Sequence, residues 1–253
     1  MSTDIAPILD GWEWEQNRLV VRKIEGLDGK EKIQMRLELG VFQMEAEGRP
    51  DGQRPYGHES LLDYHREMAE QSRTTGEDYK LDSEQCEALQ SESLQHYHRR
   101  ICCLALGEYD RSEADAQHNL RIMDLMKEHV AREEDWQALE QWRAYVLCQR
   151  TQSRALRSFQ NREFEKALRH IEHGIDLIKD WFKEQDREES IEHSLEIATL
   201  KQLRESLAIQ KPPSKEDRLR RRMERAIRSE NYEFAAQLRD KLRDIEKERG
   251  RDS

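Results

Sequence analysis

The densest cluster of glycine, proline and polar side chains in the chain is the segment from Gly48 to Ser60. It carries two guanidinium groups, a carboxylate and an imidazole, on Arg49, Arg54, Asp51 and His58. Two arginines in a glycine-rich loop could hold a carboxylate or a phosphate, because guanidinium groups pair with such oxyanions. A structural connector is the simpler interpretation, since prolines, an Asp-Gly turn and Arg–Asp pairs also stiffen a loop. A small-ligand site in this loop, packed against the first helices, is the alternative.

The other reactive side chains show no catalytic pattern. The sequence has no phosphate-binding glycine-rich loop, no nucleophile elbow and no Cys-x-x-Cys pair. On a helix, the side chains of His96 and His98 point about 200° apart, so they cannot share a metal. His170 and His173 share a face, but the sequence offers them no further ligands. The cysteines lack disulfide or zinc spacing, which predicts reduced thiols at Cys86, Cys102, Cys103 and Cys148. We therefore expect no enzyme activity, no metal site and no cofactor.

The composition favours a helical protein with charged, solvated faces. Charged residues make up 38% of the 253 residues and apolar ones 36%, with only 11 Gly and 5 Pro. No apolar run approaches the ~20 residues of a membrane span, and the first residues do not resemble a signal peptide. These features predict a cytoplasmic protein without a membrane partner. The net charge of −10 argues against direct nucleic-acid binding.

One stretch, residues 18–47, has β character. Residues 18–24 are rich in β-branched side chains, and Asp28-Gly29 supplies a tight turn. The apolar alternation of residues 33–39 then continues with shifted parity after Gly40, which predicts a bulge there. We expect a long two-stranded hairpin whose apolar face lies on the helices.

From residue 59 the chain is helical. Apolar residues recur at helical spacing over 59–72, 83–106, 110–131, 133–160, 164–185 and 188–209. Two junctions look alike, because Tyr109 and Phe164 each follow a short polar break and precede small residues. The pattern resembles the second helix of a tetratricopeptide repeat (TPR), although the two aromatics are 55 residues apart rather than 34. We expect an antiparallel array of helical hairpins. Four aromatic residues could anchor a peptide on its concave face or belong to its core: Trp136, Trp142, Tyr145 and Trp181.

The last forty residues carry the most specific pattern. Two apolar helical faces flank the polar break 228–231, which predicts two short helices folded back on each other. The sequence resembles the UVR motif, the hairpin through which the repair proteins UvrB and UvrC recognise one another. The usual motif has Phe at Tyr232 and Ala at Ile227. The resemblance implies that partner binding involves Leu219, Met223, Ala226, Tyr232, Glu233, Ala235, Ala236, Leu238, Arg239 and Asp240. Arg239 and Asp240 could make contacts across the hairpin.

The sequence changes character before this hairpin. Residues 211–217 contain Pro212-Pro213, which must interrupt any helix, and Ser214, which is a good helix N-cap. Residues 214–253 hold 13 Lys+Arg and 10 Asp+Glu, a net of +3, whereas the rest of the chain has a net of −13. We therefore expect a β-hairpin and loop over 1–57, a helical array over 58–210, a linker over 211–217 and a UVR hairpin over 218–250.

The resemblance implies a protein-interaction adaptor. UvrB- or UvrC-type repair proteins come first as partners. Components of the Clp protease system rank lower, because the known UVR adaptors of that system carry zinc-binding cysteine pairs that this chain lacks. Self-association through the hairpin is a further possibility. The whole chain also resembles bacterial proteins with a similar loop, helices and UVR tail. The alternative is a ligand-binding or catalytic protein that uses the hairpin only for assembly.

Overall fold

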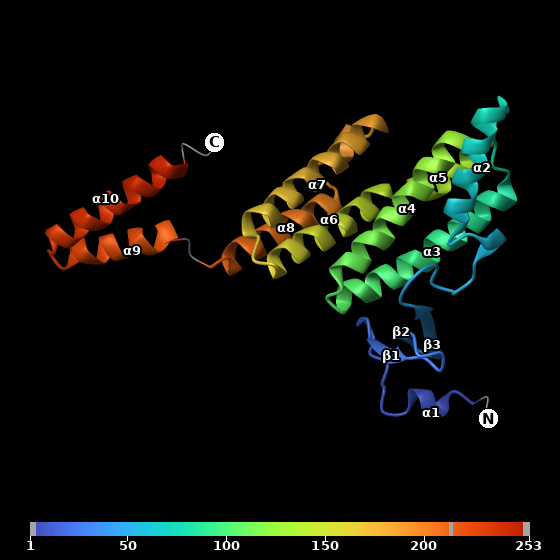
Figure 1. Ribbon diagram of the computed structural model, residues 1–253, viewed down its shortest axis with the longest axis horizontal. Coiled ribbons are helices and arrows are strands. Elements are labelled where there is room, and N and C mark those ends of the chain that lie inside the picture. Colours follow the sequence, from blue (N-terminus) through green and yellow to red (C-terminus); the bar gives the residue numbers. More distant parts are fainter. Residues whose placement is uncertain (1–3, 213–214, 250–253) are drawn as a thin grey trace. The chain divides into compact units, whose positions relative to one another are not determined.

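The computed structural model describes residues 4–212 and 215–249. They fall into two compact units, one that ends at Glu205 and one that begins at Ser206 (Figure 1). We call the first the main unit. The second contains the end of α8 and the C-terminal hairpin of α9 and α10. The serine expected to cap α9, Ser214, lies outside the described residues.

The β region forms three strands rather than two. After the short helix α1 (Ala6–Leu9), β1 (Val21–Glu25), β2 (Glu31–Leu37) and β3 (Gly40–Glu45) make an antiparallel sheet in the order β1-β2-β3. The bulge expected at Gly40 is wrong, because the chain reverses at Glu38-Leu39 and Gly40 pairs with Leu37. A two-residue turn changes the parity of the alternation just as a bulge does.

The sheet packs its apolar face on a helix, as the alternation predicts. Ile33, Met35 and Met44 are buried against Cys102 and Cys103 of α3. The described cysteines are all free and buried. The apolar face of the sheet is thereby removed from water, so α3 supplies a surface that stabilises it.

The rest of the main unit is helical and largely follows the predicted ranges. The helices are α2 (Leu61–Thr75), α3 (Ser83–Ala105), α4 (Tyr109–His129), α5 (Glu133–Glu140), α6 (Arg143–Gln160), α7 (Phe164–Glu184) and α8 (Leu195–Gln210), with 3₁₀ turns at Pro55–Gly57 and Glu188–Ser190. The predicted helix 133–160 breaks at Gln141-Trp142, and the predicted helix 188–209 starts only at Leu195. Among the described helices, none has the length and apolarity needed to cross a membrane.

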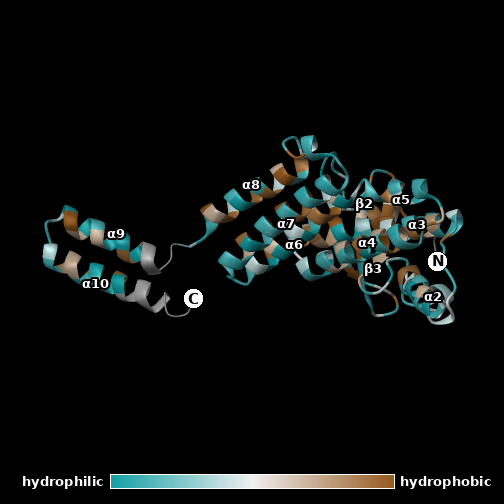
Figure 2. Cartoon of the chain, turned by 90° about the horizontal axis from the view of Figure 1, so that it is seen from above, coloured by the Kyte–Doolittle hydropathy of each residue, from teal (hydrophilic) through white to brown (hydrophobic). Residues whose placement is uncertain are grey.

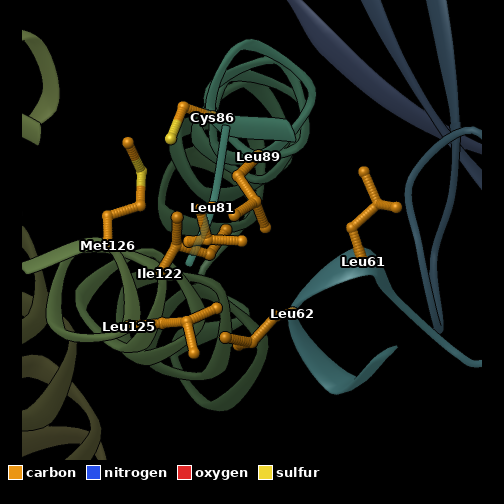
Figure 3. Packing of buried hydrophobic residues seen from close by; sticks show 8 residues of the cluster. All are labelled: Leu61, Leu62, Leu81, Cys86, Leu89, Ile122, Leu125 and Met126. Atoms are coloured by element: carbon orange, nitrogen blue, oxygen red, sulfur yellow. The ribbon is translucent and has the colours of Figure 1, made fainter. Parts of the chain in front are cut away.

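Helices that follow each other in the sequence pack as pairs. α3 pairs with α4 and α6 with α7, while α4 also packs against α6 (Figure 1). Apolar and polar residues alternate along these helices (Figure 2). Side chains from α2, α3 and α4, together with Leu81 just before α3, form one core (Figure 3). It consists of Leu61, Leu62, Leu81, Cys86, Leu89, Ile122, Leu125 and Met126.

The two junctions that look alike in sequence have the same geometry. α3 ends with Glu108 N donating to Cys103 O at 2.8 Å while Gly107 adopts a left-handed φ of 75°. α6 ends with Glu163 N donating to Ser158 O at 2.8 Å while Arg162 has φ 62°. This is the Schellman helix end, which satisfies carbonyls left free at a helix C-terminus. The aromatic then begins the next helix two residues later.

Gly174 sets the distance between α6 and α7. A Cβ atom added there would lie 2.2 Å from Oγ1 of Thr151. We expect Gly174→Ala to lower the free energy of unfolding by about 1–3 kcal/mol, because overpacking exceeds the ~1 kcal/mol gain in helix propensity. Urea denaturation measures this change. Thr151→Ala in the same chain should recover part of the loss, and an unchanged or higher stability of Gly174→Ala alone would contradict the close approach.

Candidate functional site

The C-terminal hairpin consists of α9 (Lys215–Arg228) and α10 (Tyr232–Arg249), which pack against each other. α9 ends in the same turn as α3 and α6. Asn231 N donates to Ala226 O at 2.9 Å, Glu230 N donates to Ile227 O at 3.0 Å, and Glu230 has φ 58°. Oδ1 of Asn231 then accepts from Phe234 N at 3.2 Å and caps α10. The polar break in the sequence thus ends one helix and starts the next.

Small and branched residues form the contact between α9 and α10. Ala226, Ala235 and Leu238 are buried there, and Cζ of Arg222 lies 5.6 Å from the ring centroid of Phe234. The alanines let the two backbones approach closely. Among the residues expected to bind a partner, Leu219, Met223 and Ala236 are half-buried, and Glu233 is exposed.

Two large side chains of the hairpin remain in solvent. Tyr232 is 66% exposed and Ile227 is 48% exposed. Both are positions where this chain departs from the usual motif. They offer apolar contact surface on a hairpin whose first helix is rich in arginine.

Arg239 and Asp240 do not bridge the hairpin. Nη2 of Arg239 lies 3.0 Å from Oδ1 of Asp240, so these exposed neighbours pair with each other on α10. An exposed pair of this kind contributes little to stability. A contact that does span the hairpin is that of the Arg222 guanidinium with the Phe234 ring.

The left-handed residue Glu230 gives a direct test of the hairpin turn. Glycine adopts this conformation without the steric cost that a Cβ atom carries. We expect Glu230→Gly to raise the stability of the hairpin by about 1 kcal/mol. Thermal unfolding followed by circular dichroism measures it. Ser229→Gly, one residue before, should destabilise. A loss of stability in Glu230→Gly would contradict the described turn.

The four candidate ligand residues of the Gly48–Ser60 loop do not meet in one place. Arg49 pairs with Asp51, with Nη2 3.2 Å from Oδ2. Arg54 pairs with Glu59, and Nδ1 of His58 lies 3.7 Å from Glu67. Arg49 and Asp51 therefore form an inner pair that faces the helices. Arg54 makes an outer contact within the loop, and His58 makes one with α2.

The inner pair joins a buried polar network on α3 and α4. Nε of Arg49 lies 3.5 Å from Oε2 of Glu92, and Gln95 Nε2 donates to Asp51 at 3.1 Å. Glu92 is fully buried and accepts from the backbone amides of Leu61 at 2.8 Å and Leu62 at 3.2 Å. Its carboxylate thus caps the positive N-terminus of α2. The arrangement supports the connector interpretation of the loop.

Asp115 is the centre of this network. Arg99 donates to it from Nε at 2.9 Å and from Nη2 at 2.6 Å, and Nδ1 of His96 lies 2.7 Å away. Nη1 of Arg99 also donates to the carbonyls of Glu45 at 3.0 Å and Gly48 at 2.7 Å. Burial opposes ionisation of Asp115, but Arg99 and His96 outweigh it and hold its pKa below the ordinary value. One carboxylate therefore links the sheet and the loop to α4 through Arg99.

Among the described residues, one group could hold a metal ion: Glu92, His96 and His118, whose ligand atoms lie within 4.8 Å of one another. The sequence holds a signal for it, because Glu92 and His96 are four residues apart and share a helix face. The two imidazole rings stack at 3.8 Å with an angle of 18°. Their in-plane lone pairs therefore lie in nearly parallel planes, and a ring would have to turn before both could reach one ion. Nε2 of His118 instead pairs with Glu92 at 2.9 Å.

These groups make the stability of the main unit depend on pH. Burial is the main cause that lowers the pKa of His96 below 6.5, and the pKa of Asp115 is also lowered. Both shifts mean that the unfolded chain binds protons first as the pH falls. We expect stability to decline below about pH 6.5 and again below about pH 4. Urea denaturation from pH 8 to about pH 2.5 measures both declines. His96→Gln should reduce the loss of stability that begins below about pH 6.5, whereas exposed His193→Gln should leave that loss unchanged.

Comparison with known proteins identifies the C-terminal hairpin. Residues 217–248 match the UVR family, described as the UvrB/uvrC motif. The match spans nearly all of α9 and α10 and lies in the unit that begins at Ser206. Neither a curated protein nor a solved structure matches the chain.

Proposed function

We propose that this UVR-motif chain is a non-enzymatic adaptor that binds a protein partner through its C-terminal hairpin. The UVR motif suggests a protein-interaction module. The observation that carries the proposal is that two large side chains of the hairpin, Tyr232 and Ile227, are exposed to solvent. The hairpin also belongs to a compact unit separate from the main unit. Exposed apolar side chains on a small hairpin are suited to a partner surface.

The charge distribution supports an acidic partner or an acidic surface on it. The hairpin segment carries a net of +3 on a chain of net −10. UvrB- or UvrC-type repair proteins are the first partners proposed, which would link the protein to nucleotide-excision repair. A Clp-type partner and self-association are the alternatives. The paired helices of the main unit would serve as a divergent TPR-like scaffold.

Purified components test the proposal. The full chain and a chain that stops after Gln210 are compared for binding to UvrB, UvrC and a Clp ATPase, with light scattering to detect self-association. Loss of binding, or loss of a dimer, in the shortened chain supports the proposal and identifies the partner. Equal behaviour of the two chains would contradict it.

Point variants refine the comparison. Tyr232→Ala and Ile227→Asp should weaken partner binding at least tenfold while the hairpin stays helical, because both side chains are exposed. Gln237→Ala, an exposed position on α10, is the matched control.

A ligand site in the Gly48–Ser60 loop is the second candidate. The contacts of Arg49 with Asp51 and Glu92 give this loop a structural role. Alanine at Arg49 and Asp51 should therefore lower stability. Preserved stability with a loss of partner or ligand binding would favour the loop as a site.

A further inference from the structure

A cleft of about 630 Å³ opens in the main unit between α3, α4, α5 and α6. It exists because the chain bends at Gln141-Trp142, between α5 and α6, instead of continuing as one helix. Its walls include Leu94 and Trp142, which are 55% and 57% exposed, together with Leu139. This volume lies within the range of roughly 300–1,000 Å³ found for small-ligand sites.

A buried arginine without a counterion lies at this cleft. Arg100 has no exposed surface, and its Cζ lies 5.5 Å from the ring centroids of both Tyr97 and Tyr145. Its Nε and Nη1 have no hydrogen-bond partner, and no carboxylate in the described part of the chain forms an ion pair with it. Its neighbour Arg99, by contrast, is paired with Asp115. A buried charge without a partner costs several kcal/mol, so the guanidinium favours an anion.

Asn119 places an acceptor at the same cleft. Its Nδ2 donates to the carbonyl of Ser93 at 3.1 Å, whereas its buried Oδ1 has no partner. Buried polar atoms are normally paired, so this oxygen is available for an N–H or O–H donor. The cleft thus combines a cation, an acceptor and apolar walls.

We propose that the cleft binds an apolar amino acid that has a free α-carboxylate and an acylated nitrogen. The carboxylate would pair with Arg100, the N–H would donate to Asn119, and the side chain would pack against Trp142 and Leu94. A phosphate carries nearly two charges at neutral pH, and one guanidinium in apolar surroundings would leave one of them uncompensated. Such a ligand comes either from the C-terminus of a peptide or from a free N-acyl amino acid. The proposal does not depend on the UVR hairpin.

Calorimetric titration of the full chain tests this. The probes are N-acetyl-L-leucine and the peptide Gly-Gly-Ala-Leu, each as the free acid and as the C-terminal amide. We expect the acids to bind at least tenfold more tightly than the amides. A peptide acid that binds more tightly than the N-acetyl acid identifies a peptide end as the source, and equal affinities identify the small acid.

Variants separate binding from folding. Arg100→Met should keep the fold, because an apolar side chain of similar volume can replace a buried cation, yet lose at least tenfold in affinity for the acids. Trp142→Ala, at an exposed wall position, should weaken binding severalfold, while Trp14→Ala outside the cleft is the control. Equal binding of acid and amide, unchanged affinity in Arg100→Met, or no binding of either acid at millimolar concentration would overturn the proposal.

Discussion

Replacing Asp115 with asparagine is expected to lower the free energy of unfolding of the main unit by about 3–5 kcal/mol. The substitution keeps the size of the side chain but removes the charge that Arg99 and His96 share. Arg99 would then be a buried cation, 7% exposed in its side chain, with only neutral oxygens as acceptors: the asparagine amide oxygen and the carbonyls of Glu45 and Gly48. Urea denaturation followed by circular dichroism measures the loss.

The matched control is Asp110→Asn on the same helix. Asp110 pairs with Arg157 in solvent, with its side chain 79% exposed, so its loss should cost at most about 1 kcal/mol. Similar effects of the two substitutions would mean that the buried network does not hold the sheet and loop on the helices.

Replacing Leu238 with alanine is expected to unfold the C-terminal hairpin and leave the main unit intact. Leu238 is almost fully buried, and truncation of such a leucine costs about 2–5 kcal/mol. Two helices of this size have little stability to lose, since chains below roughly 40 residues seldom fold alone. The helical content of the chain should fall by the fraction that α9 and α10 contribute to it, and partner binding should disappear.

The unfolding transition of the main unit should not move in this variant. Leu219→Ala, at a half-buried position on α9, should cost less and retain part of the binding. A shift of both transitions in Leu238→Ala would show that the hairpin and the main unit fold together, and the adaptor proposal would then lose its basis.

Periodicity and turn chemistry were sufficient to predict most helices and the C-terminal hairpin. The break at 228–231, the repeated junctions before Tyr109 and Phe164, and the apolar face of the β region all follow from residues close in sequence. The bulge expected at Gly40 failed because a bulge and a two-residue turn shift the alternation alike.

Buried polar groups could not be predicted in the same way. Arg99 and Arg100 are adjacent, yet one is paired with Asp115 and the other lies beside two tyrosines with no ion pair to a described carboxylate. The difference arises from which neighbouring helix each side chain faces, and that depends on tertiary packing. Of the aromatics expected on a binding face, Trp142 and Tyr145 line the cleft, whereas Trp181 is buried and donates to Glu140.

The shared helix end before Tyr109, Phe164 and Tyr232 has a consequence for the speed of folding. Each of these turns joins helices that are consecutive in the chain, so most helix contacts connect residues of small sequence separation. Proteins rich in such local contacts fold fast, because little loop entropy is lost before contacts form. The contacts of Arg99 with Glu45 and Gly48 bridge 54 and 51 residues. We therefore expect the helix pairs to form early during folding and the docking of the sheet to be the slow step.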